Sequence, residues 1–152
     1  MSACTLQGGR ARSNTALVSD DSQQEALPRS RLPILVVDDF DDNRLLYAST
    51  IAEAGYAVLE ATNGQEAIDK IGTSRPAVII MDLSMPVMDG WEAIRRIKTD
   101  PQTADIVIIA LTSHATNYGL QKARDAGAEA VLTKPCVPQD LLGVISALFP
   151  GR

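Results

Sequence analysis

The apolar run Val78–Met81, which leads directly into Asp82, restricts the folds open to this chain more than any other stretch. An uninterrupted apolar run without polar alternation is typical of a strand that is buried on both faces, as in parallel sheets. In open α/β folds, ligands bind outside the carboxyl ends of such strands. The run therefore predicts an α/β fold and places Asp82 in its functional site.

Further apolar runs alternate regularly with segments that have helical features. We expect strands at residues 34–37, 57–61, 77–81, 106–111 and 130–133. We expect helices at residues 44–54, 64–71, 90–98, 115–126 and 138–148. The residues expected to cap helix starts are Asp41–Asn43, Asn63 and Asp89, and those expected to end helices are Gly55 and Gly127. Strands that alternate with helices of this length predict a parallel sheet covered on both faces through right-handed crossovers.

Length and cysteine usage limit the domain count and the cellular setting. A chain of 152 residues is long enough for one domain with a sizeable core, but not comfortably for two. Cys4 and Cys136 are the only cysteines, which is no disulfide framework, so we expect a cytoplasmic protein. The apolar runs are too short to span a bilayer and the N-terminus has no secretory h-region, so we expect no membrane association.

Charge and composition separate the first 31 residues from the rest. Residues 1–31 contain four Arg and three acidic residues, and since the whole chain carries a net charge of −5, the remainder carries −6. The polar, aperiodic composition of residues 1–31 predicts a disordered or loosely docked N-terminal tail. Residues 32–150 are expected to form the domain, with none after it. An acidic body without a basic stripe argues against a nucleic-acid partner.

Polar residues follow four of the expected strands at the point where each strand ends. They are Asp38-Asp39, Asp82, Thr112 and Lys134. Because the carboxyl ends of parallel strands share one edge of the sheet, these residues should converge although they are far apart in the sequence. Three carboxylates brought together should repel and raise one another's pKa. A hard divalent cation relieves that repulsion, which predicts a site for Mg²⁺, with Mn²⁺ as a substitute.

Each of these residues has an expected role at the cation site. Asp39 and Asp82 should bind the cation directly, together with the main-chain carbonyl of Ser84, and Asp38 should act through a metal-bound water. Asp82 would then attack a phosphorus atom and become an aspartyl phosphate. Lys134 would supply positive charge and the Thr112 hydroxyl a hydrogen bond to the phosphoryl oxygens.

Five motifs at these strand ends resemble those of a known family. They are Asp38-Asp39, Met81-Asp82, Met85-Pro86-Val87-Met88-Asp89-Gly90, Leu111-Thr112-Ser113 and Thr133-Lys134-Pro135. Together they resemble the receiver domain of two-component response regulators, over residues 32–149. The resemblance implies a flavodoxin-like, doubly wound (βα)5 fold with strand order 2-1-3-4-5. It also implies phosphorylation of Asp82 by a sensor histidine kinase or phosphotransfer protein, in a stand-alone, chemotaxis-regulator-like receiver without a C-terminal output domain.

The resemblance further implies a switch that transmits phosphorylation to a partner. The Thr112 hydroxyl would move toward the phosphate, and the face formed by the fourth helix, fifth strand and fifth helix would change its contacts with an output protein. Many members couple this shift to an aromatic residue three positions before the lysine, where this chain has Val131. Tyr118 is a candidate substitute. Ser84 and His114 match the positions that tune dephosphorylation, and Lys134-Pro135 the position of a cis bond.

Two other functions stay open at this point. One is a pseudo-receiver or scaffold without phosphate turnover. This alternative is favoured by Val131, which stands where many members have an aromatic residue. The other is an aspartate-nucleophile, Mg²⁺-dependent phosphatase of the haloacid dehalogenase type, which typically has a second Asp where this chain has Ser84. We therefore expect a phosphoacceptor that catalyses only its own phosphorylation and dephosphorylation, as a monomer or a phosphorylation-dependent dimer. Cys136 and Trp91 are expected to be packing residues.

Overall fold

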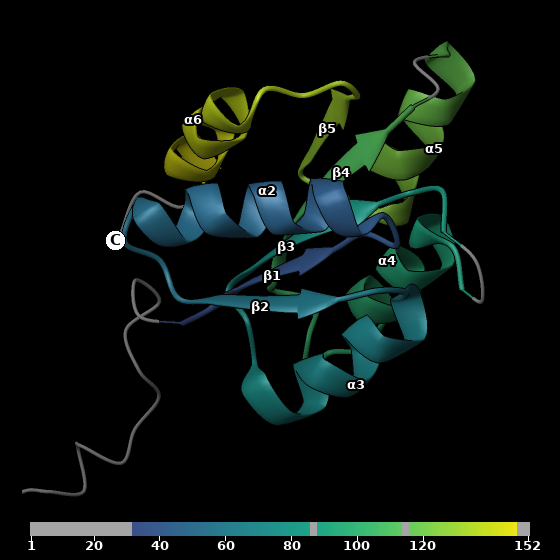
Figure 1. Cartoon of the computed structure of the whole chain (residues 1–152). Helices are drawn as coiled ribbons and strands as arrows, with labels where there is room; N and C mark the ends of the chain where they lie inside the picture. Colours follow the sequence, from purple (N-terminus) through teal and green to yellow (C-terminus); the bar gives the residue numbers. More distant parts are fainter. Residues whose placement is uncertain (1–31, 86–87, 114–115, 149–152) are drawn as a thin grey trace, which may run out of the picture.

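The computed structural model describes residues 32–85, 88–113 and 116–148. Its strands form one five-stranded parallel sheet in the order β2-β1-β3-β4-β5 (Figure 1), which confirms the predicted order. The strands are β1 (Ile34–Val37), β2 (Val58–Ala61), β3 (Val78–Asp82), β4 (Val107–Thr112) and β5 (Ala130–Thr133). The helices are α2 (Asp41–Glu53), α3 (Gly64–Ser74), α4 (Gly90–Thr99), α5 (Asn117–Ala126) and α6 (Pro138–Leu148). Among the described residues, no helix has the length and apolar character that a membrane span requires.

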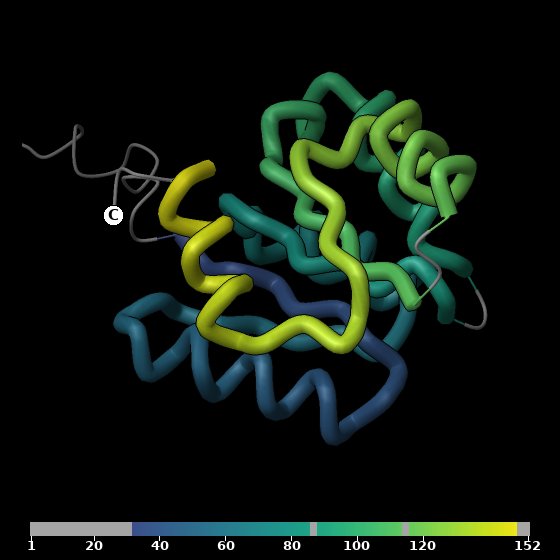
Figure 2. Tube along the Cα trace, turned by 90° about the horizontal axis from the view of Figure 1, so that it is seen from above, coloured from purple at the N-terminus to yellow at the C-terminus, as the bar shows by residue number. Residues whose placement is uncertain are grey.

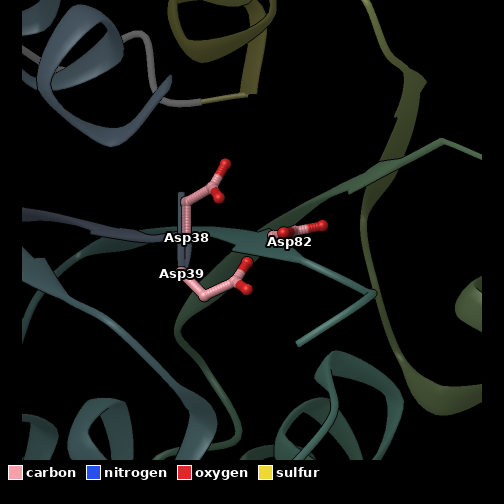
Figure 3. Close-up of side chains that lie close together, drawn as sticks. All are labelled: Asp38, Asp39 and Asp82. Carbon is pink, nitrogen blue, oxygen red and sulfur yellow. The ribbon is translucent and has the colours of Figure 1, made fainter. Parts of the chain in front are cut away.

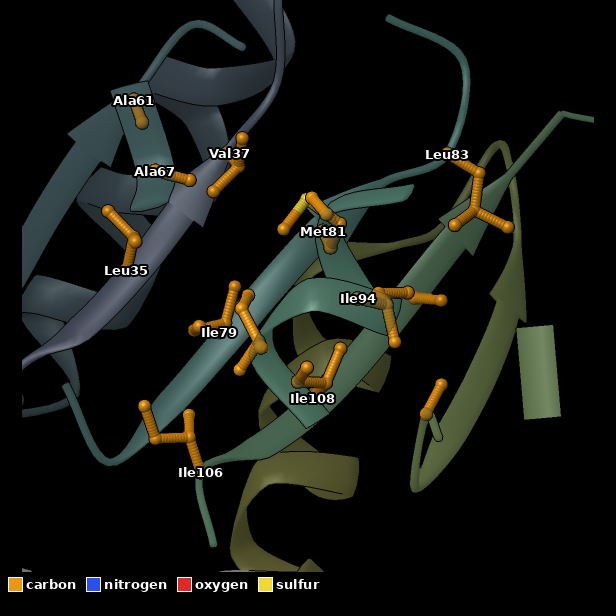
Figure 4. Packing of buried hydrophobic residues seen from close by; sticks show 14 of the residues in the cluster. Leu35, Val37, Ala61, Ala67, Ile79, Met81, Leu83, Ile94, Ile106 and Ile108 are labelled. Carbon is orange, nitrogen blue, oxygen red and sulfur yellow. The ribbon is translucent and has the colours of Figure 1, made fainter. Parts of the chain in front are cut away.

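The sheet is the middle of three layers. Helices α2 and α6 lie side by side on one face, and α3, α4 and α5 cover the other (Figures 1 and 2). Successive side chains of a strand point to opposite faces, so Ile79 and Met81 of β3 pack under α3–α5, whereas Val78 and Ile80 pack under α2 and α6. Figure 4 shows Ile79 and Met81 close to Ile94 of α4. The apolar run that precedes Asp82 therefore contributes side chains to the hydrophobic core on both faces of the sheet.

Two predicted N-cap residues are confirmed, and one predicted helix start is wrong. Asn63 and Asp89 each accept a hydrogen bond from a main-chain N–H in the first turn of the following helix. In contrast, α2 begins at Asp41 rather than at residue 44, and its N-cap residue is Phe40, which makes no side-chain cap. Asp41 and Asp42 thus lie in the first turn, where acidic side chains favour the positive end of the helix dipole without capping it.

Two helix ends follow the predicted glycine pattern, whereas α3 and α4 end without glycine. Gly55 and Gly127 have positive φ angles directly after their helices, as the sequence predicts. Helix α3 runs three residues further than expected, to Ser74, and ends at Arg75, a non-glycine residue with a φ of 46°. The predicted start of α5 at residue 115 lies outside the described residues; Thr116 caps that helix through its hydroxyl.

Lys98 and Glu129 join the end of α4 to the start of β4. The Lys98 ammonium group donates to the carbonyls of Ala104 and Ile106, at 3.1 and 2.7 Å, and pairs with the Glu129 carboxylate at 2.7 Å. The same carboxylate accepts the main-chain N–H of Ile108 at 2.8 Å. Charged side chains therefore bind the main-chain groups that precede and begin the β4–β5 ladder.

Candidate functional site

Asp38, Asp39 and Asp82 meet at the carboxyl edge of the sheet (Figure 3). Val37 of β1 pairs with Met81 of β3, so the residue after each of them emerges at the same level of the sheet. One carboxylate oxygen from each of the three residues lies within 4.8 Å of the others. Asp38 and Asp82 are only 1% and 3% exposed, whereas Asp39 is exposed. The predicted convergence of the three carboxylates is thus present.

Burial makes the charge of Asp82 costly. It raises the pKa of this carboxyl from the usual 3.8 to about 6, and the neighbouring carboxylate of Asp38 adds to the increase. The positive charge of Lys134 and the main-chain N–H of Ser84, which donates to Asp82 Oδ1 at 3.2 Å, act in the opposite direction. At neutral pH, Asp82 is therefore ionised in a site that attracts additional positive charge.

The positively charged side chain of Lys134, which follows the edge strand β5, reaches the same site. Its Nζ lies 3.0 Å from Asp38 Oδ2 and 3.4 Å from Asp82 Oδ2. Burial disfavours the ammonium charge, but the hydrogen bond to Asp38 and the charges of both carboxylates raise the pKa of Lys134 above its usual value. The Lys134 main-chain N–H donates to the carbonyl of Thr112 at 2.7 Å, and the Lys134–Pro135 bond is cis, as expected. The lysine is thus a charged member of the site.

The remaining predicted residues lie at the same edge or outside the described ranges. Thr112 is the last residue of β4 and is buried, while Ser84 is exposed two residues after Asp82. Val131 is half-buried and packs against the core under α3–α5. Tyr118 is 76% exposed in the first turn of α5, and its role as a substitute for the aromatic switch residue stays a prediction. His114 lies outside the described residues.

Trp91 and Cys136 have the predicted packing roles. Trp91 is half-buried against the core under α3–α5, and the Lys122 ammonium group lies 4.5 Å from its ring centroid. Cys136 is half-buried on the opposite face of the sheet, where its carbonyl accepts the Tyr47 hydroxyl at 3.3 Å. Neither side chain contributes a ligand to the acidic group.

Arg44 is a site residue that the sequence did not reveal. Its guanidinium group donates to the carbonyl of Asp38 at 3.0 Å and to the Glu60 carboxylate at 3.0 Å, and it pairs with Asp41 at 2.7 Å. It thereby fixes the main chain of the acidic pair to β2 and to the first turn of α2. The available signal was a basic residue one turn into the helix that follows the acidic pair.

Gly90 holds the loop after β3 close to the acidic site. A Cβ atom at this position would lie 2.4 Å from the carbonyl oxygen of Asp82 and 2.6 Å from Cα of Leu83. The Gly90 N–H donates to the Leu83 carbonyl at 3.2 Å. Only glycine allows α4 to begin this close to the end of β3, and this contact sets where the loop leaves the site.

The donor set suits a small, hard dication. Carboxylate and carbonyl oxygens are the ligands that Mg²⁺ prefers, usually with retained waters. The clustered oxygens of the three Asp residues and the raised pKa of Asp82 both favour such an ion. The three carboxylates are therefore a group that could hold such an ion beside the buried Asp82.

Comparisons with known proteins lead to the same family. The family model described as "Response regulator receiver domain" matches residues 34–146. Chemotaxis protein CheY of Thermotoga maritima is 36% identical over 115 residues, which cover 74% of this chain and 93% of that protein. The polar-differentiation response regulator DivK of Brucella anthropi is 32% identical, over 72% of this chain and 86% of DivK.

A solved structure shows the same fold. The chemotaxis response regulator CheY4 of Vibrio cholerae has a TM-score of 0.74 and 33% sequence identity, over 78% of this chain and 99% of that one. Receivers of this family are phosphoacceptors of two-component systems, and Mg²⁺ binding is typical of them. The match over most of the chain, together with the acidic group at the carboxyl edge, shows that the protein belongs to the response regulator receiver domain family.

Proposed function

We propose that this protein accepts a phosphoryl group on Asp82 from a sensor histidine kinase or a phosphotransfer protein, and signals through protein–protein contacts. The proposal rests on the environment of the Asp82 carboxyl group. This carboxyl is buried beside two other carboxylates, and a lysine ammonium group lies 3.4 Å away. A buried acid that is costly to ionise alone, but surrounded by groups that bind a cation and an anion, suits phosphoryl transfer.

Asp39 and Asp82 would hold Mg²⁺ or Mn²⁺ directly, with the Ser84 carbonyl as a third ligand, while Asp38 would bind it through water. When bound, the cation supplies positive charge that offsets the carboxylates and the oxygens of the phosphoryl group. Arg44 keeps the acidic pair in place through its hydrogen bond to the Asp38 carbonyl. The exposure of Asp39 leaves a route for an ion from solvent.

In the transfer step, one carboxylate oxygen of Asp82 forms a bond to phosphorus as the P–N bond of a phosphohistidine breaks. The imidazole leaves with the electron pair of that bond. Lys134 is near enough to Asp82 to pair with the phosphoryl oxygens after only a small movement. Thr112 would donate a hydrogen bond to them, and Ser84 and His114 would tune the attack of water that removes the group.

The output surface is proposed to comprise α5, β5 and α6. Phosphorylation would draw Thr112 toward the new phosphate and change how this surface binds its partner. Val131 has no hydroxyl or ring through which to report the change, so the signal would pass through the hydroxyl of Thr112 and the main-chain link from Lys134 to Thr112. A monomer or phosphorylation-dependent dimer and a cytoplasmic location stay predictions.

Phosphorylation with acetyl phosphate and Mg²⁺, or with a phosphohistidine donor, tests the proposal. We expect one acid-stable, alkali-labile adduct that maps to Asp82 and disappears in Asp82→Asn. Asp69→Asn is the matched control, because Asp69 is an exposed acid on α3. An adduct that persists in Asp82→Asn would contradict the acceptor assignment, and its absence from the wild type would favour the scaffold alternative. Continuous turnover of many phosphomonoesters would instead indicate a phosphatase.

A further inference from the structure

A cavity of about 370 Å³ lies between α3 and α4, on the opposite edge of the sheet from the acidic site. Its walls include Arg75, just before β3, and Thr103, just before β4, so it lies at the amino ends of these strands. The two helices that flank it contact each other along one face of the sheet (Figure 1). No residue of the proposed phosphoryl-transfer site lines this cavity.

The lining combines an apolar interior with a charged rim. Ile68, Ile71 and Ile97 contribute the apolar surface, and Ile71 and Ile97 are almost fully buried. Arg75 and Arg96 contribute the rim, with side chains that are 53% and 55% exposed. An apolar interior with a few charged groups that fix orientation is the usual composition of a small-molecule site, and the volume is in the usual range.

The arginines have hydrogen-bonding capacity for a ligand. Arg75 donates to the main-chain carbonyl of Gln102 and lies 3.9 Å from the carboxylate of Asp105, while Arg96 pairs through Nε with Glu92 at 2.9 Å. A guanidinium group has five N–H donors, so these contacts use only part of its capacity. Asp100 also lines the cavity, but its Oδ1 accepts the main-chain N–H of Gln102 at 2.9 Å. The lining itself therefore contains two arginines and one aspartate, while Asp105 and Glu92 pair with the arginines from outside the cavity.

Two of the residues that line the cavity have notable backbone features. Arg75 adopts a positive φ of 46°, which is unfavourable for a residue with a side chain, and this places it across the gap to Gln102. Gly72 lies within α3, where glycine weakens the helix relative to alanine. A Cβ atom on Gly72 would meet no other atom within 4 Å. A larger residue at 72 would fit the backbone and extend into open space beside the cavity.

We propose that this cavity binds a small organic anion with an apolar ring or chain, such as an aromatic carboxylate or sulfonate. The isoleucines would contact the apolar part, and the guanidinium groups of Arg75 and Arg96 would pair with the anionic group. A neutral apolar ligand would leave the remaining N–H donors of Arg75 and Arg96 unused, and an inorganic anion would leave the isoleucines without contact. Only a ligand with both parts uses both halves of the lining.

The test uses 8-anilinonaphthalene-1-sulfonate as the probe, because it joins a sulfonate to an apolar ring system. Titration of the full chain should give saturable fluorescence at one site. Gly72→Leu should abolish this binding, because its side chain occupies the space beside Arg75. The matched control is Gly143→Leu on α6, where a Cβ atom also meets nothing within 4 Å. This control should bind the probe as the wild type does, and thermal melts should show that both variants fold.

Charge is tested with a second pair of variants on one helix. Arg95 and Arg96 both pair with Glu92 at 2.9 Å, but only Arg96 lines the cavity. Arg96→Gln should weaken binding about tenfold, as expected for loss of a charge-assisted hydrogen bond, and Arg95→Gln should leave it unchanged. The neutral probe N-phenyl-1-naphthylamine should bind the wild type more weakly than the sulfonate. Absence of saturable binding, binding that survives Gly72→Leu, or equal effects of the two arginine variants would overturn the proposal.

Discussion

The two edges of the sheet differ in how their charged groups are supplied. At the carboxyl edge, carboxylates come from the ends of β1 and β3 and are forced together in a buried place, where the pKa of Asp82 rises to about 6. At the amino edge, guanidinium groups come from the end of α3 and from α4 and remain half exposed around a cavity. The carboxyl edge therefore holds buried carboxylates that repel one another, whereas the amino edge holds guanidinium groups that solvent stabilises.

Two glycines give this comparison a direct test, and the first carries the largest expected effect. Gly90→Ala should destabilise the fold by about 3 kcal/mol, because its Cβ would lie 2.4 Å from the carbonyl oxygen of Asp82 and the main chain would have to move. Urea denaturation followed by circular dichroism measures the change. A loss below about 1 kcal/mol would show that the carboxyl edge is less tightly packed than described.

Neutralising Asp82 should stabilise the protein when no dication is present. The pKa of this carboxyl is about 6 in the folded protein against 3.8 for the ordinary group. Ionisation of Asp82 therefore lowers the free energy of unfolding progressively as the pH rises from about 4 to 6. Above pH 6, Asp82→Asn should be more stable than the wild type by about 2 kcal/mol, and the difference should vanish near pH 4. Denaturation curves in EDTA at several pH values measure it, with Asp69→Asn as the control.

Protons and dications should compete at the carboxyl edge. Because Asp82 has a pKa of about 6, Mg²⁺ affinity should be nearly constant above pH 7 and fall below pH 6, approaching tenfold per pH unit. Calorimetric titration of Mg²⁺ between pH 5 and 8 measures the profile. Binding of the sulfonate probe at the amino edge should not follow this profile, and a shared pH dependence would contradict the independence of the two edges.

The smallest expected effect is at the amino edge. Gly72→Ala should stabilise the protein by about 0.5–1 kcal/mol, because alanine favours the helix and its Cβ meets no other atom within 4 Å. The same urea denaturation gives the value, and Gly143→Ala on α6 is the companion variant. A destabilisation at Gly72 alone would mean that the space beside the cavity is less open than the structure indicates.

Topology explains why the carboxyl edge could be predicted from the sequence. Once Val78–Met81 is assigned as a central parallel strand, Asp82 must lie beside the residue that follows β1. The structure shows this arrangement, because Val37 pairs with Met81. The strand order came from the family resemblance and is confirmed. Arg44 could not be predicted in the same way, because its partners lie on three different segments and depend on a side-chain conformation.

The amino edge was not predictable from local patterns. The sequence around Arg75 gives no signal for a positive φ, and the helix predicted to end at residue 71 left Gly72 outside it. The early start of α2 at Asp41 was missed because acidic residues are favoured both in the first turn and at the N-cap. The residues 1–31 and His114 lie outside the described parts of the chain, and the predictions made for them stand as predictions.

The contact of Glu129 with β4 has a consequence for assembly with other chains. The start of a strand beside a shorter neighbour exposes main-chain donors and acceptors, to which a strand of another molecule can add. Here the Glu129 carboxylate takes the N–H of Ile108, and Lys98 takes the carbonyls of Ala104 and Ile106. Because charged side chains already bind these positions, an incoming strand would find these three main-chain groups paired. The ion pair thus covers main-chain groups at the start of β4 that extend beyond the shorter strand β5.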